Sequence, residues 1–423
     1  MADIPAGEGP SVRVRPWVAT GALLLALVSE GYDLQAANFA APAIVTSLRI
    51  AKADVGPLLS ASLLGVLFGA ALIGPLGDRV GRKRLIMGGC LAYGLLSLAA
   101  AACGTLWELI VLRFLIGLGL GGVLPNALAL ASELARRGNE ATAAGLIGIG
   151  ITFGGVLAGL AAAALMPKFG WPAVFIVGGA LPLVILVLLK AVLPESPAYL
   201  RRRAEASFVR TWSPAPAALF RGGLAARTLA IWAIFVAILL CVYLLSGWIP
   251  LLLNQSGFST RSAALIGAAY QAGGVAGGVV ASLILKRRGW DVVSGFAVLA
   301  VAVMVFLVWG PVSTPALVSG VILAGFFVTG TQNAINGAGG ASYEAPIRSS
   351  GLGWALGVGR LGSVAGPLVG SVAVLLGMHE PRHLFALPIV PLLVAALVAA
   401  WLGRRVTFQT NRIQRGEQLC PER

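Results

Sequence analysis

The chain has 423 residues, of which 58% are hydrophobic and 11% are charged. Soluble domains carry roughly 25% charged residues, so this chain lacks the polar surface that two or three soluble domains would need. The composition also excludes intrinsic disorder, which requires low hydrophobicity. We therefore expect an integral membrane protein in which most side chains face lipid or neighbouring helices.

Apolar segments long enough to cross a bilayer, which takes about 20 residues, recur along the whole chain. They predict an all-α membrane protein with twelve transmembrane helices, which places both termini on the same side. The expected spans are 17–41, 55–77, 85–105, 107–131, 141–165, 171–193, 227–252, 262–285, 290–310, 314–340, 349–376 and 383–403.

The net charge of +15 follows this topology. Most Lys and Arg residues fall on the side that holds both termini, and the few on the other side are Arg49, Lys52, Lys168, Arg261 and Arg382. Because basic residues are retained in the cytoplasm, we expect both termini inside a bacterial inner membrane. The basic excess therefore indicates topology, and we expect contact with the lipid bilayer, no nucleic-acid partner and a monomeric protein.

A polar, basic and proline-containing stretch at 194–226 interrupts the apolar pattern. The halves on either side resemble each other, because Glu133 and Arg137 recur 211 residues later as Glu344 and Arg348. Two related six-helix units of this kind predict a transporter whose site lies between the halves, near the middle of the membrane. The predicted organisation is a cytoplasmic tail at 1–16, a six-helix bundle at 17–193, a cytoplasmic linker at 194–226, a second six-helix bundle at 227–403 and a cytoplasmic tail at 404–423.

The first span carries two carboxylates, Glu30 and Asp33, which lie three residues apart and therefore share one helix face. At 1.5 Å per residue they lie about 20–24 Å from the cytoplasmic end. A charged carboxylate at that depth costs several kcal/mol unless it is neutral, paired or hydrated. Structural pairing is one interpretation. The other is a proton-binding group facing a central cavity, and either residue could be the one that titrates.

Two arginines lie inside later spans. Arg113 lies about 10 Å below the outer end of its span, close to the depth of Asp33, so we expect an ion pair that controls the charge of this acid. Arg360 lies near the middle of its span, where a planar guanidinium suits bidentate binding of a carboxylate. A structural pair with an acid of the first half is the alternative for Arg360.

The loop after the second span reads GPLGDRVGRKR at 74–84. Gly81 suits a turn with positive φ, and Asp78 is placed to cap a helix and to pair with a nearby arginine. The loop resembles the cytoplasmic signature of the major facilitator superfamily, G-x-L-x-D-R-x-G-R-K. The resemblance implies the two-bundle fold of that superfamily and a gating latch between the halves, formed here by Gly74, Asp78, Arg79, Gly81 and Arg82.

Three spans resemble one branch of this superfamily, the aromatic acid:proton symporters. The resemblance rests on the acid-Gly-aromatic-Asp pattern at 30–33, the run from Arg113 to Gly122, and the Gly-rich segment 351–367 around Arg360. It implies proton-coupled import of a small organic acid anion of the benzoate or hydroxybenzoate type by alternating access. Asp33 with Glu30 would carry the proton, Arg113 would modulate it, and Arg360 would bind the substrate carboxylate.

Other polar and aromatic residues of the spans could line a central cavity or serve packing alone. Those assigned to substrate binding beside Arg360 are Tyr32, Gln35, Asn333, Trp354 and Tyr270, and further candidates are Phe39, Tyr243, Trp248, Gln271, Gln332 and Asn336. A symporter of sugar acids or short-chain carboxylates and a proton-linked exporter stay open as alternatives. A sensor or membrane enzyme is disfavoured because no soluble domain and no catalytic constellation is present, and the cysteine spacing indicates no metal or cofactor site.

Overall fold

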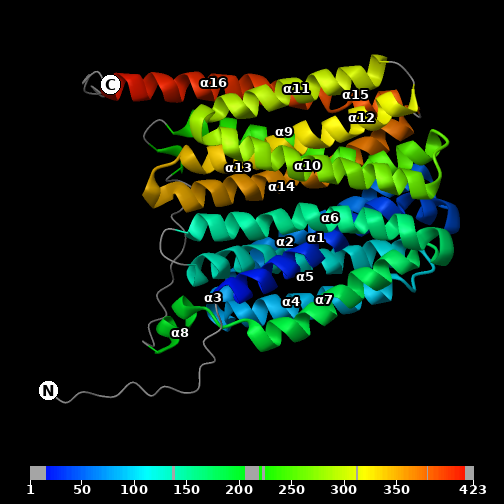
Figure 1. Ribbon diagram of the computed structural model, residues 1–423, viewed down its shortest axis with the longest axis horizontal. Coiled ribbons are helices and arrows are strands. Elements are labelled where there is room, and N and C mark those ends of the chain that lie inside the picture. Colours follow the sequence, from blue (N-terminus) through cyan, green and yellow to red (C-terminus); the bar gives the residue numbers. More distant parts are fainter. Residues whose placement is uncertain are drawn as a thin grey trace.

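The computed structural model describes residues 16–135, 139–204, 219–221, 224–310, 313–378 and 380–414. Long helices lie side by side in two stacked groups, α1 to α7 in one and α9 to α16 in the other (Figure 1). Within the predicted linker, 205–218 and 222–223 lie outside the described residues, as do 1–15 and 415–423 of the two predicted tails.

The first half contains six long helices, one short element before α2 and two short elements after it. Its long helices are α1 (Pro16–Ser47), α2 (Val55–Leu72), α4 (Arg82–Ala100), α5 (Leu106–Leu134), α6 (Glu140–Phe169) and α7 (Pro172–Val192). The short elements are η1 (Lys52–Asp54), η2 (Gly74–Leu76) and α3 (Gly77–Val80), and α8 (Pro197–Ala204) follows α7.

The second half repeats this plan with two helices divided into shorter elements. Its helices are α9 (Ala225–Gln255), α10 (Thr260–Arg288), α11 (Trp290–Trp309), α12 (Thr314–Ala324), η4 (Gly325–Thr329), α13 (Gly330–Ala341), α14 (Ala345–Leu375), α15 (Pro381–Ala386) and α16 (Ile389–Gln414). The π-helical turn η4 joins α12 and α13 into one continuous span, and α15 leads into α16.

Eleven helical segments of the described chain are long and apolar enough to cross a membrane. The helix outside this set is α1, which has 32 residues and contains Glu30 and Asp33, whose charges lower its mean hydropathy. With α1 added, the described residues contain twelve membrane helices, the number that the sequence predicts. An even number of crossings places Pro16 and the end of α16 at the same end of the bundle, which we call the terminal end.

Glycine lets helices within each half approach until their backbones touch. A methyl group on Gly65 of α2 would lie 2.1 Å from the carbonyl oxygen of Phe114 on α5. In the same way, a methyl group on Gly31 of α1 would lie 1.9 Å from the carbonyl oxygen of Ile151 on α6. The high glycine content therefore serves close packing around α1 and α2.

The two halves meet through α2 against α14, α6 against α10, and α1 against α9. The backbone N–H of Gly56 donates to Ser371 Oγ at 2.9 Å, and Ser60 Oγ donates to the carbonyl oxygen of Val364 at 2.8 Å. These contacts lie on the side of the bundle away from the terminal end, because Gly56 begins α2 and Ser371 lies near the end of α14. We call this contact region the seam.

Replacing Gly65 with alanine is expected to lower the thermal unfolding midpoint of the detergent-purified protein. The added methyl group would force α2 and α5 apart, and overpacking of this kind costs about 1–3 kcal/mol. The matched control is Gly88→Ala on α4, where nothing lies within 4 Å of the added methyl group. Equal midpoints for the two variants would contradict the packing argument.

Candidate functional site

Arg113 on α5 and Asp33 on α1 form an ion pair inside the first half. Arg113 Nη1 donates to Asp33 Oδ1 at 2.8 Å and to the backbone carbonyl oxygen of the same residue at 3.1 Å. Its Nη2 donates to Ser62 Oγ on α2 at 3.0 Å, and its Cζ lies 5.9 Å from the ring centre of Phe175 on α7. The ion pair expected from the helix depths is therefore present, and residues of α2 and α7 lie beside it.

Both charged side chains of this pair are at most 1% exposed. Such a pair is not necessarily stabilising, but removing one partner leaves an uncompensated buried charge. The hydroxyl groups of Ser62 and of Ser97 on α4 also contact the pair. Sequence reasoning missed both serines, because a serine in an apolar span is too common to be singled out without knowing its neighbours.

Glu30 lies one turn before Asp33 on α1 and is 1% exposed. Its Oε2 atom has no hydrogen-bond partner among the described residues. On α4 it interacts electrostatically with Tyr93 and Cys90, and the Tyr93 hydroxyl is hydrogen-bonded to Ser29 at 2.9 Å. The cation that acts on Glu30 is Arg360 of the second half. Glu30 and Asp33 thus differ in their partners, although they share a helix face.

Arg360 lies near the middle of α14 and is partly exposed. Its Nη1 donates to the hydroxyl oxygen of Tyr243 on α9 at 3.4 Å. It forms no salt bridge with any residue that the structure describes. A guanidinium at this depth without an anionic partner is suited to bind a carboxylate that enters from outside the protein.

Two further candidates for substrate binding lie on α1. Tyr32 is buried, and its hydroxyl donates to the carbonyl oxygen of Val174 on α7 at 3.2 Å, which directs it into the first half. Gln35 accepts a hydrogen bond from Asn38 and packs beside Gly155 of α6. Gln271 of α10 contacts the same glycine, so the structure brings Gln35 to the meeting point of the halves.

The remaining candidates contact residues of the second half. Tyr270 is buried on α10 beside Thr329 of η4, and Asn333 Nδ2 donates to the Thr329 carbonyl oxygen at 3.0 Å. Trp354 is 41% exposed and stacks on Trp232 of α9, with ring centres 6.2 Å apart. The hydrogen bond that the structure gives Arg360 is with Tyr243, so these three side chains are not brought onto the guanidinium.

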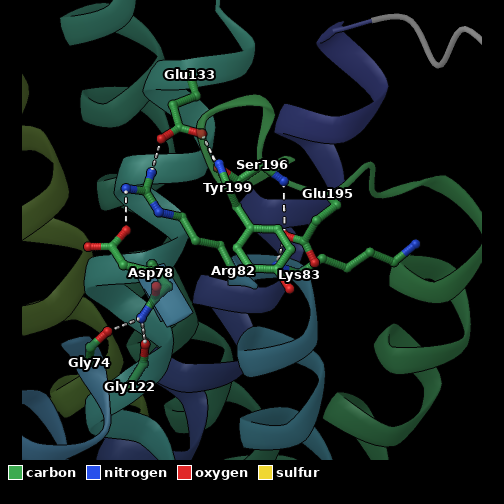
Figure 2. A network of polar contacts seen from close by, with 10 residues as sticks. Gly74, Asp78, Arg82, Lys83, Gly122, Glu133, Glu195, Ser196 and Tyr199 are labelled. Carbon is green, nitrogen blue, oxygen red and sulfur yellow. Dashed lines mark hydrogen bonds and ion pairs between the residues drawn. The ribbon is translucent and has the colours of Figure 1, made fainter. Parts of the chain in front are cut away.

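The motif at 74–84 forms a polar network at the terminal end of the first half (Figure 2). Arg82 Nη2 donates to Asp78 Oδ1 at 3.1 Å, and its Nη1 is hydrogen-bonded to Glu133 near the end of α5. Glu133 also accepts a hydrogen bond from Ser196 Oγ, which follows α7. One arginine thus links α3 to α5, and Glu133 extends the link to the segment before α8.

Glu195 closes the other side of this network (Figure 2). Its Oε1 accepts hydrogen bonds from the backbone N–H groups of Lys83 at 3.0 Å and Ser196 at 2.9 Å. It also lies against Gly81, which has φ of 108°, a conformation that favours glycine. Sequence reasoning treated Glu195 as part of a linker and missed this role. The signal that could have found it is a carboxylate just after an apolar span, at the same end of the bundle as the basic motif.

Gly74 and Arg79 of the motif also lie at the terminal end. The carbonyl oxygen of Gly74 accepts a hydrogen bond from Asn126 Nδ2 at 3.0 Å, and the same amide donates to the Gly122 carbonyl oxygen at 2.8 Å. Arg79 is exposed. The partners of Arg82 in this structure belong to the first half, whereas the sequence predicts a latch between the halves.

Comparison with known proteins identifies the family. Residues 23–344 match the model of the Major Facilitator Superfamily. The chain belongs to the major facilitator superfamily. Its sequence is 34% identical over 407 residues to the gallate transporter of Pseudomonas putida, with 90% of each chain covered. It is 35% identical over 396 residues to the 4-hydroxybenzoate transporter PcaK of Pseudomonas aeruginosa, covering 87% of this chain and 88% of the relative.

A third relative is the 3-(3-hydroxy-phenyl)propionate transporter of Escherichia coli, which is 36% identical over 370 residues, covering 86% of this chain and 88% of the relative. Among solved structures, the D-xylose-proton symporter superposes with a TM-score of 0.73 at 15% identity, covering 92% of this chain and 97% of that chain. At such identity the superposition shows the fold. The family resemblance and the twelve-helix fold predicted from the sequence are confirmed.

The burial of the Asp33–Arg113 ion pair has a testable consequence for the stability of the protein. Arg113→Met alone is expected to destabilise the purified protein by about 3–5 kcal/mol, because it leaves the Asp33 carboxylate buried without its cation. The double variant Arg113→Met, Asp33→Leu should recover most of that loss, since no charge is left unpaired. Denaturation of both variants in the same detergent measures the difference, and a double variant no more stable than the single one would contradict this explanation.

Proposed function

We propose that this protein is a proton-coupled symporter that imports a small aromatic carboxylate across the bacterial inner membrane by alternating access. The observation that carries the proposal is Arg360, a partly exposed guanidinium near the middle of α14 without a salt bridge to any described residue. The relatives supply the substrate class, because their names refer to gallate, 4-hydroxybenzoate and a hydroxyphenyl propionate. Each of these is a monocarboxylate with an aromatic ring.

In this proposal the substrate carboxylate binds Arg360 in bidentate geometry, next to the Tyr243 hydroxyl. Gln35 approaches the substrate from the first half, since this side chain lies beside Gly155 where α6 meets α10. The other candidates are Tyr32, Tyr270, Asn333 and Trp354; each has contacts in its own half and would reach the substrate in another conformation of the cycle.

The proton is carried by the carboxylates of α1, Asp33 or Glu30, and Arg113 modulates the charge of Asp33. The terminal end lies in the cytoplasm, because most of the basic residues are there. The halves meet along the seam on the other side, so this conformation is closed toward the outside. As the halves rock, the network of Gly74, Asp78, Gly81 and Arg82 keeps the terminal end of the first half together. The protein acts as a monomer and performs no enzymatic reaction.

Proteoliposome uptake tests the substrate and the coupling. Labelled 4-hydroxybenzoate or gallate is expected to accumulate against its gradient when the outside is more acidic than the inside, and to leak out when a protonophore is added. Competition separates the alternatives. Displacement by sugar acids or short-chain carboxylates, with no displacement by aromatic acids, would overturn the proposed substrate class. Transport only out of the compartment that holds the terminal end would indicate an exporter.

Arg360→Lys tests the binding site. The half-saturating substrate concentration is expected to rise at least about tenfold, because lysine lacks the planar fork that binds a carboxylate with two hydrogen bonds. The matched control is Arg382→Lys, an exposed arginine of α15 paired with Glu380, which should leave the value unchanged. Unaltered apparent affinity of Arg360→Lys across a series of aromatic acids would argue against the assignment.

A further inference from the structure

The membrane interior of this protein holds a balanced set of charges. Four charged residues lie away from the ends of the described membrane helices: Glu30, Asp33, Arg113 and Arg360. Two are acidic and two are basic, so the set has no net charge when all four are ionised. Because an uncompensated charge in this environment is strongly unfavourable, any ligand that changes the sum must be accompanied by a compensating charge.

The four charges form two unequal pairs. Asp33 and Arg113 are joined directly at 2.8 Å inside the first half, and Arg113 donates to Asp33 twice, through the carboxylate and through the backbone. Protonation of Asp33 would leave Arg113 as a buried cation without an anion. Asp33 is therefore engaged by a cation inside its own half, and the pair holds α1 against α5.

Glu30 and Arg360 form an open pair across the two halves. Arg360 is the cation that acts on Glu30, yet no salt bridge joins them. Glu30 is 1% exposed, and its Oε2 atom lacks a hydrogen-bond partner among the described residues. Each member is thus free to take another partner, Glu30 a proton and Arg360 an anion.

Building on the proposed function, we propose that Glu30 carries the transported proton and that the substrate carboxylate takes its place as the counter-ion of Arg360. One monoanion then enters with one proton, and the transport cycle moves no net charge. The substrate anion binds Arg360, which leaves the Glu30 carboxylate without a counter-charge. A proton from water on the same side then bonds to a Glu30 carboxylate oxygen, and both leave together on the other side.

The surroundings of Glu30 offer no competing charge. On its own helix Asp33 is engaged by Arg113 of α5, and α4 presents the neutral side chains of Tyr93 and Cys90. The other helices packed on α1, namely α2, α6, α7, α9 and α10, place their charged residues near helix ends or have none. Substrate binding at Arg360 of α14 therefore removes the counter-charge of Glu30 and favours its protonation.

Transport by Glu30→Gln tests the assignment in proteoliposomes with labelled 4-hydroxybenzoate. Accumulation driven by a pH gradient should fall at least tenfold, because glutamine cannot bind and release the proton. Exchange of internal unlabelled for external labelled acid at equal pH should continue within about threefold and lose its dependence on pH. The conservative control Glu30→Asp should accumulate the acid, since it keeps a carboxylate. Gradient-driven accumulation by Glu30→Gln, or an unaltered pH profile of exchange, would overturn the inference.

The wild-type protein provides a second measurement that does not depend on the folding of a variant. At a fixed pH gradient, a potassium diffusion potential set with valinomycin should leave the accumulation ratio of 4-hydroxybenzoate unchanged for either sign of the potential. A change of the ratio in proportion to the potential would overturn the inference and leave the proposed function standing. A wild-type protein that neither accumulates nor exchanges aromatic acids would overturn the proposed function itself.

Discussion

The cost of placing a charge inside the membrane governs the central part of this structure. The ion pair of Asp33 with Arg113 offsets that cost directly, because the two charges lie 2.8 Å apart and Arg113 also donates a hydrogen bond to Ser62. Because α1, α2, α5 and α7 all contact the pair, it also determines how these helices meet. The open pair of Glu30 and Arg360 is the counterpart, since it spans the two halves and neither member forms a salt bridge with a residue that the structure describes.

Packing within the first half makes it suited to move as one unit. Glycines such as Gly65 and Gly31 allow backbone contact between helices, so small displacements within the half would create clashes. At the terminal end, Arg82 and Glu133 link the motif at 74–84 to α5 and to the segment before α8 (Figure 2). The chain that leaves the first half is therefore anchored to it before it continues toward the second.

The contact between the halves is of a different kind. At the seam, single hydrogen bonds from Gly56 and Ser60 reach α14, and a pair of glutamines flanks Gly155. Among the residues that the structure describes, no ion pair joins the two halves, whereas the ion pair of Asp33 and Arg113 lies wholly within one half. Strong interactions inside a half and weak ones between halves are what rigid-body alternating access requires.

The sequence by itself determined the class of protein, the twelve helices, the family and the ion pair of Asp33 with Arg113. Hydropathy is a local property, and the fixed rise of a helix converts residue number into depth, so charges on different spans can be matched by residue number alone. The depth of a residue does not determine in which direction around the helix its side chain points. Tertiary packing alone decided that Tyr32 reaches Val174 and that Glu195 rather than a residue of the second half joins the motif. It also decided that Glu30 Oε2 has no hydrogen-bond partner among the residues that the structure describes. The physical reason is that helix rotation and tilt depend on contacts between residues far apart in the chain, which no local pattern contains.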